Sequence, residues 1–578
     1  MAISRIKRLL PFLAWPRVDR KTLVGDLLAG ITVSLLAIPQ SLAYAQLAGV
    51  PAYYGLYAAL TPAIVAVLFG SSPILSTGPV ALTSLLTAAS VSHITPPGSE
   101  QFISYVTLLA LLSGLFQIGL GLARAGVLLN LLSHPVLMGF INGAAIIIAL
   151  SQLSALTGIA ASQTDHFLFD IWQVLSHLDE LHVMSLAYGL LAVALLWAHR
   201  RYAPRLPGVL VMVAVLTWLS AVTRFAEHGG QIVGDIPHGM PSISLPALDW
   251  GVSMDLLPGA FVIALIGFME AMSSCKVIAI KTRSRWDENQ ELIGQGLAKV
   301  AAAFCHSMPV SGSFSRSALN LASGAQSGFS ALIAAAFVLL TLLFLTPLLY
   351  HLPKPALAAL IVVAVANLVD LGSLRRAWQA SRDDGVAALL TFVATLAFAP
   401  NIQNGILTGM LFALGAFIYR RMSPRIIEVG MHSDGTLRDA RHFKLPPLHR
   451  QIGAIRCDAA LFFANVSFFD EAVRKLERDN PELKYVLVAA SGINQIDASG
   501  IEMLRELVRR LRECGITLVI SGAKRQVLEV VERTGLAAEI GPANFLGSDA
   551  LAVKYLLQRA QADRTEGAAE TANPDRSP

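Results

Sequence analysis

Residues 305–328, CHSMPVSGSFSRSALNLASGAQSG, decide how the rest of this chain is interpreted. The segment is rich in serine and glycine and contains one arginine, Arg316, yet it lies within a strongly apolar part of the chain. It is either a polar surface loop between two membrane helices or a helix that is broken at membrane depth. A broken helix would leave backbone N–H groups free to bind an anion beside Arg316.

The composition is that of a membrane protein. Of the 578 residues, 54% are hydrophobic and 14% are charged, whereas soluble domains contain about 25% charged residues. The mean hydropathy is +0.59, and long uncharged runs are typical of membrane-spanning helices. The net charge is only +5, with the basic residues between apolar runs, which argues against a nucleic-acid partner. Signatures of a phosphate loop, a metal cluster or a catalytic triad are missing, so we expect no metal, no cofactor and no enzymatic activity.

Fourteen helical segments are predicted in the apolar part of the chain. The third and the tenth are short, and the fifth contains a candidate break. The segments are 22–45, 52–70, 78–92, 104–122, 126–157, 183–199, 207–224, 255–280, 288–305, 314–324, 328–350, 355–370, 385–399 and 402–421.

The charges of the loops predict the orientation. One opposite loop, 158–182, contains Asp165, Asp170, Asp179 and Glu180 and neither Lys nor Arg. By the positive-inside rule, the basic segments and both termini lie in the cytoplasm. The basic segments are 1–21, 199–205, 281–285, 375–376 and 420–425.

A weak internal repeat relates the first helix to the eighth. Residues 26–30, DLLAG, align with 255–259, DLLPG, and residues 76–79, STGP, align with 310–313, VSGS. Seven helices separate the paired units, so the two halves have opposite orientations in the membrane. Inverted repeats with broken helices at corresponding positions are typical of secondary transporters, whose binding site lies between the two breaks.

The two breaks together predict an anion site. Pro79 suits the first turn of one short helix, and Ser313 or Ser315 can cap the other. Two helix N-termini that face each other present unpaired N–H groups and partial positive charge, and Arg316 adds a full charge. The alternative is that the serines only allow close packing of helices.

Two further helices of the membrane part, the first and the eighth, supply candidate residues for the site. Gln40 and Tyr44 lie four residues apart on the first helix, so they share a face and can donate to a small oxyanion; the alternative is plain packing. Glu270 lies within the eighth helix, where a carboxylate is a functional hypothesis by default. It carries a coupling proton, pairs with Arg316, or forms a structural ion pair with Lys276.

From about residue 440, the pattern becomes that of a small α/β domain. Residues 485–490 and 516–521 are predicted to be buried strands, and 467–479 and 524–534 helices, the latter ended by a glycine. An apolar stripe at helical spacing predicts a further helix between the strands; it consists of Ile501, Leu504, Val508 and Leu511.

Three motifs resemble the SulP family of anion transporters, the sulfate permeases and their relatives. They are GDLLAGITVSLLAIPQSLAYAQLAGVPAYYGLYAAL, GSSPILSTGPVALTSLL and PVSGSFSRSALNLASGAQSG. The resemblance implies a polytopic α-helical membrane domain with a 7+7 inverted repeat, whose core moves against a gate in elevator fashion. Glu270 matches the carboxylate of the proton-coupled permeases. The site lining that the resemblance implies is Gln40, Tyr44, Gly78, Pro79, Val80, Ser315 and Arg316.

The segment 496–500, IDASG, resembles the signature of STAS domains, which SulP transporters share with anti-sigma factor antagonists. In the antagonists, the serine that matches Ser499 is phosphorylated. In this chain, Ser499 is either a regulatory phosphosite or a plain helix cap, and the domain is a candidate contact for a cytoplasmic protein.

These observations predict a bacterial inner-membrane transporter that imports sulfate with a proton, and the resemblance implies a homodimer in the lipid. The alternatives are sodium-coupled transport of bicarbonate, transport of a dicarboxylate, and a passive anion channel or sensor. The predicted divisions are a cytoplasmic N-terminal segment, a transport domain, a STAS domain and a disordered tail, at 1–21, 22–425, 440–560 and 561–578.

Overall fold

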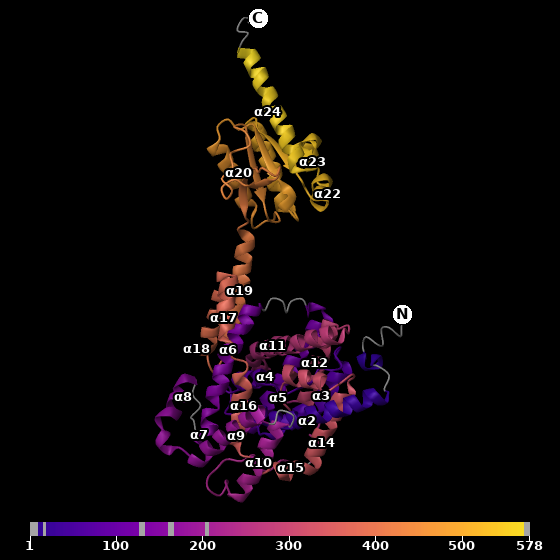
Figure 1. The fold of residues 1–578 in the computed structure, drawn as a ribbon, viewed down its shortest axis with the longest axis vertical. Coiled ribbons are helices and arrows are strands. Elements are labelled where there is room, and N and C mark those ends of the chain that lie inside the picture. Colours follow the sequence, from indigo (N-terminus) through magenta and orange to yellow (C-terminus); the bar gives the residue numbers. More distant parts are fainter. Residues whose placement is uncertain are drawn as a thin grey trace. The chain divides into compact units, whose positions relative to one another are not determined.

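The structure, a computed structural model, describes residues 10–15, 19–126, 133–159, 167–202, 207–237 and 239–571. The chain divides into two compact units, residues 1–413 and 414–578. Figure 1 shows that the first unit is a bundle of helices and that the second contains a sheet with helices. The predicted division into a helical membrane part and an α/β part is confirmed in this general form.

All fourteen predicted segments are helical within the described residues. Seven helices are long and apolar enough to cross a membrane, judged by length and composition. The matching elements are α2 (Arg20–Leu47), α3 (Tyr53–Phe69), α4 (Ala81–Val91), α5 (Glu100–Leu122), α6 (His134–Ser151) with α7 (Leu153–Thr157), α9 (Val183–Tyr202), α10 (Gly208–Val222), α11 (Trp250–Thr282), α12 (Glu288–Phe304), α13 (Phe314–Ala322), α14 (Phe329–Leu340), α16 (Lys354–Ala366), α18 (Arg382–Ala397) and α19 (Gln403–Met422).

Several elements of the first unit lie outside those predictions. α8 (Phe167–Ser176) and α17 (Leu371–Ala380) were interpreted as loops, because both are short and α17 contains consecutive arginines. α14 continues through a π-helical turn (Thr341–Leu345) into α15 (Thr346–Leu349). Short 3₁₀ turns lie at Pro11–Ala14 and Leu178–Glu180.

The helices of the first unit form two groups, each with members from both halves of the chain. In the core bundle, α2–α5 and α11–α14, helix α12 packs on α5 and α3, and α14 packs on α2. In the gate bundle, α6, α7, α9, α10 and α16–α19, helix α18 packs on α6, and α16 packs on α9. This interleaving means that the two halves of the sequence do not fold as separate blocks.

A pair of very short strands joins the two halves inside the core bundle. β1 (Thr77–Gly78) precedes α4, and β2 (Ser311–Gly312) precedes α13. The strands are antiparallel, with Thr77 opposite Gly312 and Gly78 opposite Ser311. Because antiparallel strands run in opposite directions, the half-helices that follow them also leave the pair in opposite directions. This is the inverted arrangement that the sequence repeat predicts.

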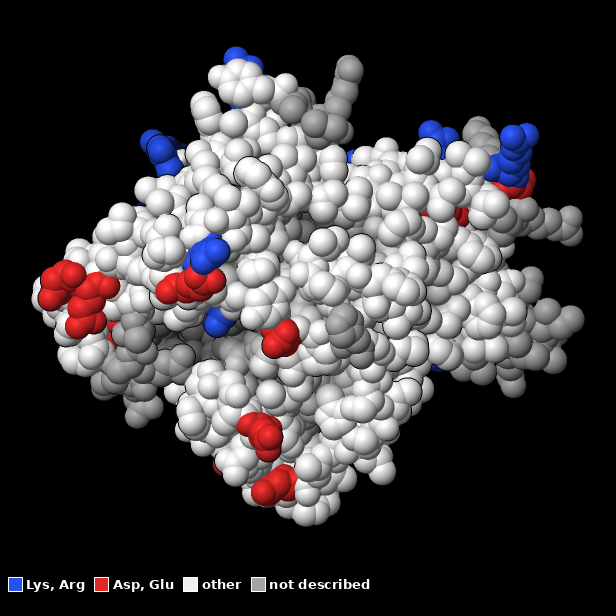
Figure 2. Space-filling view, turned by 90° about the horizontal axis from the view of Figure 1, so that it is seen from below, with Lys and Arg blue, Asp and Glu red and all other residues white. Residues whose placement is uncertain are grey.

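The surface of the first unit is largely apolar. Figure 2, which views the molecule from below, shows wide uncharged areas with scattered patches of Asp and Glu and of Lys and Arg. Large exposed apolar patches mark contact with lipid or protein. Tryptophan is an amphipathic residue common at membrane interfaces, and the exposed tryptophans among the described residues are Trp172, Trp197, Trp218, Trp250 and Trp378.

The second unit is built on a six-stranded sheet with the order β4-β3-β5-β6-β7-β8. The pairs from β5 to β8 are parallel, whereas β3 is antiparallel to both neighbours. The apolar stripe of α21 is buried against this sheet, as predicted. The elements are β3 (Ile426–Met431), β4 (Leu437–Asp439), β5 (Ile452–Cys457), α20 (Val466–Asp479), β6 (Tyr485–Ala489), α21 (Ala498–Glu513), β7 (Thr517–Ser521), α22 (Arg525–Arg533), α23 (Leu536–Ile540), β8 (Phe545–Leu546) and α24 (Asp549–Thr571), with 3₁₀ turns at Ala490–Gly492 and Pro542–Asn544.

Two predicted boundaries differ from the structure. The sheet begins at β3, before residue 440, because the antiparallel strands β3 and β4 extend its edge. Residues 561–571, predicted to be disordered, continue α24, since Ala, Glu, Gln and Arg favour helix. Residues 572–578 and 1–9 lie outside the described residues.

Candidate functional site

The strand pair brings the N-termini of two short helices together. Val80, before α4, has an extended backbone and no side chain caps that helix. Before α13, the hydroxyl of Ser313 accepts a hydrogen bond from the backbone N–H of Arg316 at 3.4 Å. Ser313 is therefore the cap, while Ser315 is exposed in the first turn. Most first-turn N–H groups of a helix have no partner within it, so both ends present free donors.

Further hydrogen bonds hold these two ends in place. The backbone N–H of Ser313 donates to the carbonyl of Ser76 at 2.8 Å. The backbone N–H of Ser76 donates to the hydroxyl of Ser317 at 2.9 Å. Both bonds involve Ser76, so the residue that precedes β1 is joined to the start of α13 by a main-chain bond and a side-chain bond.

The side chain of Arg316, in the first turn of α13, extends to the residues that precede α4. Its side chain is 1% exposed, and Nη1 donates to the carbonyl oxygen of Pro79 at 2.9 Å. Nη2 has no hydrogen-bond partner among the described residues. A Cβ built on Gly78 would lie 3.1 Å from that nitrogen. Glycine thus leaves room for a buried guanidinium whose free N–H groups require an acceptor.

The first helix supplies the two polar side chains that its sequence suggested. Gln40 and Tyr44 are each 8% exposed on α2, and Gln40 Oε1 has no partner among the described residues. Tyr44 lies within electrostatic range of both Arg316 and Glu270. The structure therefore brings Tyr44, Glu270 and Arg316 into one region of the core bundle.

Glu270 forms no ion pair within 4.0 Å among the described residues. Its Oε2 atom is enclosed and has no hydrogen-bond partner, and the charged groups that act on it are Lys299 and Arg316. Lys276 is exposed elsewhere on α11. The structural pair between Glu270 and Lys276, one of the three alternatives, is not formed.

Sequence analysis missed a line of buried polar residues on α12. The carboxylate of Glu291, 1% exposed, accepts the backbone N–H groups of Ser71 and Ser72, both at 2.9 Å. Gln295 Nε2 donates to the hydroxyl of Thr77 in β1 at 2.9 Å. Lys299 follows one turn later and is fully buried. Their spacing of four residues along one helix face was the signal that could have revealed them.

The cavity at this site is small. It has a volume of about 30 Å³ and touches Arg316, Asn320 and the strand β1, together with small side chains of α2, α3 and α14. A space of this size holds water. Within the described part of the chain, no group of three His, Cys, Asp or Glu side chains is placed to bind a metal ion.

Ser499 is the second residue of α21 in the other unit. The cap of that helix is Asp497, whose carboxylate accepts the backbone N–H of Gly500 at 2.8 Å. The interpretation of Ser499 as the helix cap is therefore wrong, because the residue two positions earlier fills that role. Phosphorylation of Ser499 stays a prediction.

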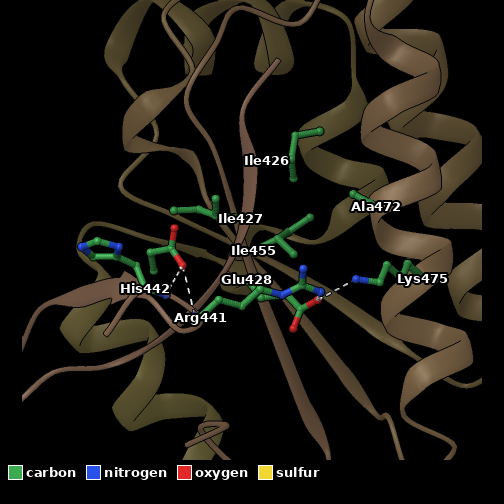
Figure 3. A pocket seen from close by; sticks show the side chains of 9 residues that line it. Ile426, Ile427, Glu428, Arg441, His442, Ile455, Ala472 and Lys475 are labelled. Atoms are coloured by element: carbon green, nitrogen blue, oxygen red, sulfur yellow. Dashed lines mark hydrogen bonds and ion pairs between the residues drawn. The ribbon is translucent and has the colours of Figure 1, made fainter. Parts of the chain in front are cut away.

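The second unit also contains a cavity of about 460 Å³ (Figure 3). Glu428 on its wall pairs with Lys475 at 3.4 Å and with Arg441 at 3.8 Å. The backbone N–H groups of His442 and Arg441 hold the pKa of the Asp439 carboxyl below its usual value. Both acidic groups of this cavity therefore already have partners.

Two family models match this chain. The sulfate permease family matches residues 23–391, and the STAS domain matches residues 447–548. The probable sulfate transporter 4.2 of Arabidopsis thaliana is 33% identical over 555 residues, which cover 93% of this chain and 82% of that protein.

Two solved structures share the fold. The murine Solute Carrier 26 family member A9 anion transporter has a TM-score of 0.89 at 21% identity, covering 96% of this chain and 94% of that chain. The transmembrane domain of the cyanobacterial bicarbonate transporter BicA has a TM-score of 0.58 at 25% identity, covering 69% of this chain and 99% of that chain.

Proposed function

Since this chain belongs to the sulfate permease family and carries a C-terminal STAS domain, we propose that it imports sulfate together with a proton across a bacterial inner membrane. Membership makes it a membrane anion transporter rather than an enzyme. The proposed movement is a displacement of the core bundle against the gate bundle in elevator fashion.

The observation that carries the proposal is the free guanidinium nitrogen of Arg316. A buried charged group whose donors are not all paired is destabilising, so an anion that accepts from the free Nη2 would stabilise this arrangement. The uncapped start of α4 and the first turn of α13 add N–H donors from two directions. We place the anion against these groups, with Gln40, Tyr44, Val80 and Ser315 as the further lining.

Glu270 is the proposed carrier of the coupled proton. Among the described residues, its Oε2 atom has no hydrogen-bond partner, whereas an ionised carboxylate that only stabilised the fold would be expected to have both oxygens hydrogen bonded. Arg316 acts electrostatically on both Glu270 and the proposed anion position. Arrival of the anion offsets the positive charge of Arg316 and thereby favours a proton on Glu270.

Sulfate is the proposed substrate because the family relative in Arabidopsis thaliana is described as a probable sulfate transporter and matches along most of its length. Bicarbonate with sodium is the second candidate, because the BicA transmembrane domain shares the fold at 25% identity.

Uptake of labelled sulfate into proteoliposomes with an imposed pH gradient tests the site and the coupling. We expect Arg316→Ala to reduce uptake at least about a hundredfold, since it removes charge-assisted hydrogen bonds of about 1.5 to 3 kcal/mol each. We expect Glu270→Gln to lose the acceleration by the pH gradient while it still binds sulfate. Unchanged uptake by Arg316→Ala would exclude the site assignment.

The same vesicles separate the rival functions. A requirement for sodium would favour bicarbonate-type coupling, and competition by fumarate would favour a dicarboxylate. Flux that follows the anion gradient without accumulation would indicate a channel or sensor. The cytoplasmic position of both termini, a homodimer, and a protein partner of the STAS domain are further parts of the proposal, which site-directed labelling and cross-linking test.

A further inference from the structure

Lys299 is a fully buried lysine at the centre of the core bundle. Its Nζ donates to Gln117 Oε1 at 2.8 Å, and Gln117 Nε2 donates in turn to the carbonyl of Ala264 at 2.7 Å. A Cβ built on Gly267 would lie 3.3 Å from Nζ. The ammonium group therefore lies against α11 one turn before Glu270.

The same part of α11 contacts the strand that leads to Arg316. The hydroxyl of Ser311 in β2 donates to the carbonyl of Gly267 at 2.7 Å. Lys299 thus lies near the back of the strand pair whose ends form the proposed anion site. The direction of the Lys299 side chain is set by its hydrogen bond to the neutral Gln117, whose amide is held in turn by the main chain of α11.

No carboxylate lies within 4.0 Å of Lys299 among the described residues. The acidic group that acts on it is Glu270 on α11. Glu291 lies two turns earlier on α12 and is engaged by Ser71 and Ser72. The packed helix α3 contains no acidic or basic residue, and α5 contains only Glu100 at its exposed start.

An isolated buried ammonium is costly unless other charges compensate it. With Glu270 ionised, the side chains of Lys299, Glu270 and Arg316 together carry one excess positive charge. Binding of a divalent anion changes the net charge of this group to one negative charge, and protonation of Glu270 then brings the net charge to zero. Without Lys299, a single proton would leave the loaded site negative.

We propose that Lys299 supplies the second positive charge of the anion site, an inference that rests on the proposed function. This charge allows a divalent anion and one proton to be held together with Glu270 and Arg316 without net charge on this group. Lys299 does not touch the anion in this arrangement. It is a specificity-determining residue that acts through the electrostatic potential at the site.

The test is a double-mutant cycle on the affinity of the purified full-length protein for labelled sulfate. Lys299→Gln is measured in the natural background and in the Glu270→Gln background, and Lys299→Arg serves as the variant that keeps the charge. We expect Lys299→Gln to weaken sulfate binding about tenfold or more in both backgrounds. Lys299→Arg is expected to stay within about threefold of the natural chain.

The Glu270→Gln background separates this proposal from a purely structural role. If Lys299 only compensates Glu270, then removing both charges leaves sulfate affinity unchanged relative to Glu270→Gln, and the proposal is overturned. The double variant leaves neither charge unpaired, so it gives an answer even if Lys299→Gln alone does not fold. Failure of sulfate binding in the natural chain, or normal binding by Arg316→Ala, would instead contradict the proposed function.

Discussion

The core bundle and the gate bundle are both assembled from the two halves of the chain, yet they differ in what they bury. Among the described residues of the first unit, the charged side chains that are buried all lie in the core bundle. The gate bundle buries polar but uncharged residues. The charged set is Asp26, Glu291, Lys299 and Arg316, and the gate set includes Asn142, Thr391 and Thr395.

The partners of these groups explain the difference. In the gate bundle, Asn142 accepts the backbone N–H of Asp370 at 2.8 Å, and Thr391 donates to a carbonyl of its own helix. Among the described residues of the core bundle, Glu270 Oε2 and Arg316 Nη2 have no hydrogen-bond partner. The enclosed gate atoms without such a partner, among them Thr217 Oγ1, Ser220 Oγ and Gln403 Oε1, belong to neutral side chains, so the unpaired charged groups of the described first unit lie in the core bundle. This difference supports our proposal that the anion binds in the core bundle.

After Arg316→Ala, the largest expected effect on sulfate binding comes from Gly78→Ala in the core bundle. The added Cβ would lie 3.1 Å from Arg316 Nη2 and 3.7 Å from its Cζ, so the guanidinium must move away from the proposed anion position. We expect sulfate affinity to fall about tenfold or more, the equivalent of about 1.4 kcal/mol. Binding of labelled sulfate to the purified protein measures it.

The matched control is Gly119→Ala on α5, in the same bundle, where the added Cβ meets nothing within 4 Å. This control is expected to bind sulfate like the natural chain. Equal binding by Gly78→Ala and Gly119→Ala would contradict the placement of Arg316 in the site.

The next largest effect tests the gate bundle through Gly139→Ala. Its Cβ would lie 2.2 Å from the carbonyl oxygen of Ala388 on α18, which forces α6 and α18 apart. Overpacking of this kind costs about 1 to 3 kcal/mol. We expect a lower midpoint of thermal unfolding in detergent and an unchanged sulfate affinity of the folded fraction.

Gly415→Ala on α19 serves as the control, because its Cβ has no neighbour within 4 Å. A loss of sulfate affinity in Gly139→Ala without any loss of thermal stability would reverse the assignment, because the gate bundle would then contribute directly to the site.

The smallest expected effect distinguishes Glu291, a buried charge that we expect only to stabilise the fold, from the charged groups of the proposed site. Glu291→Gln keeps a carbonyl acceptor for Ser71 and Ser72 but removes the charge, so we expect a loss of about 1 kcal/mol in the free energy of unfolding. Sulfate uptake per folded molecule is expected to stay the same, as for the control Glu288→Gln in the first turn of the same helix. A changed pH dependence of uptake would show that Glu291 also takes part in proton transfer.

Much of the fold could be predicted from apolar runs and their interruptions. Most of the fourteen helices follow from long apolar runs, and the short third and tenth follow from Ser-Thr-Gly-Pro and its counterpart in the other half. The position of Arg316 beside Pro79 follows from the same alignment. These features depend on local sequence, which a single chain displays directly.

Other features depend on how helices and strands pack in three dimensions, which the sequence alone does not show. The strands β1 and β2 have only two residues each, too few for any alternating pattern. Lys276 seemed a partner for Glu270 because it is near in sequence, but six residues along a helix point to a different face. Lys299, on another helix, is the lysine whose charge acts on Glu270. Its partner could be identified only once α11 and α12 were packed.

The strand pair also has a consequence for the order of events during synthesis. Ser76 and Ser317, which are hydrogen bonded beside it, are 241 residues apart in the chain. At about 5 to 20 residues per second, the ribosome needs about 10 to 50 s to make the second partner after the first. For that time, the start of α4 is in the membrane without the strand and the arginine that complete it. The half-built protein is therefore a distinct, exposed species, and its protection by lipid, water or the insertion machinery is part of how a working transporter is made.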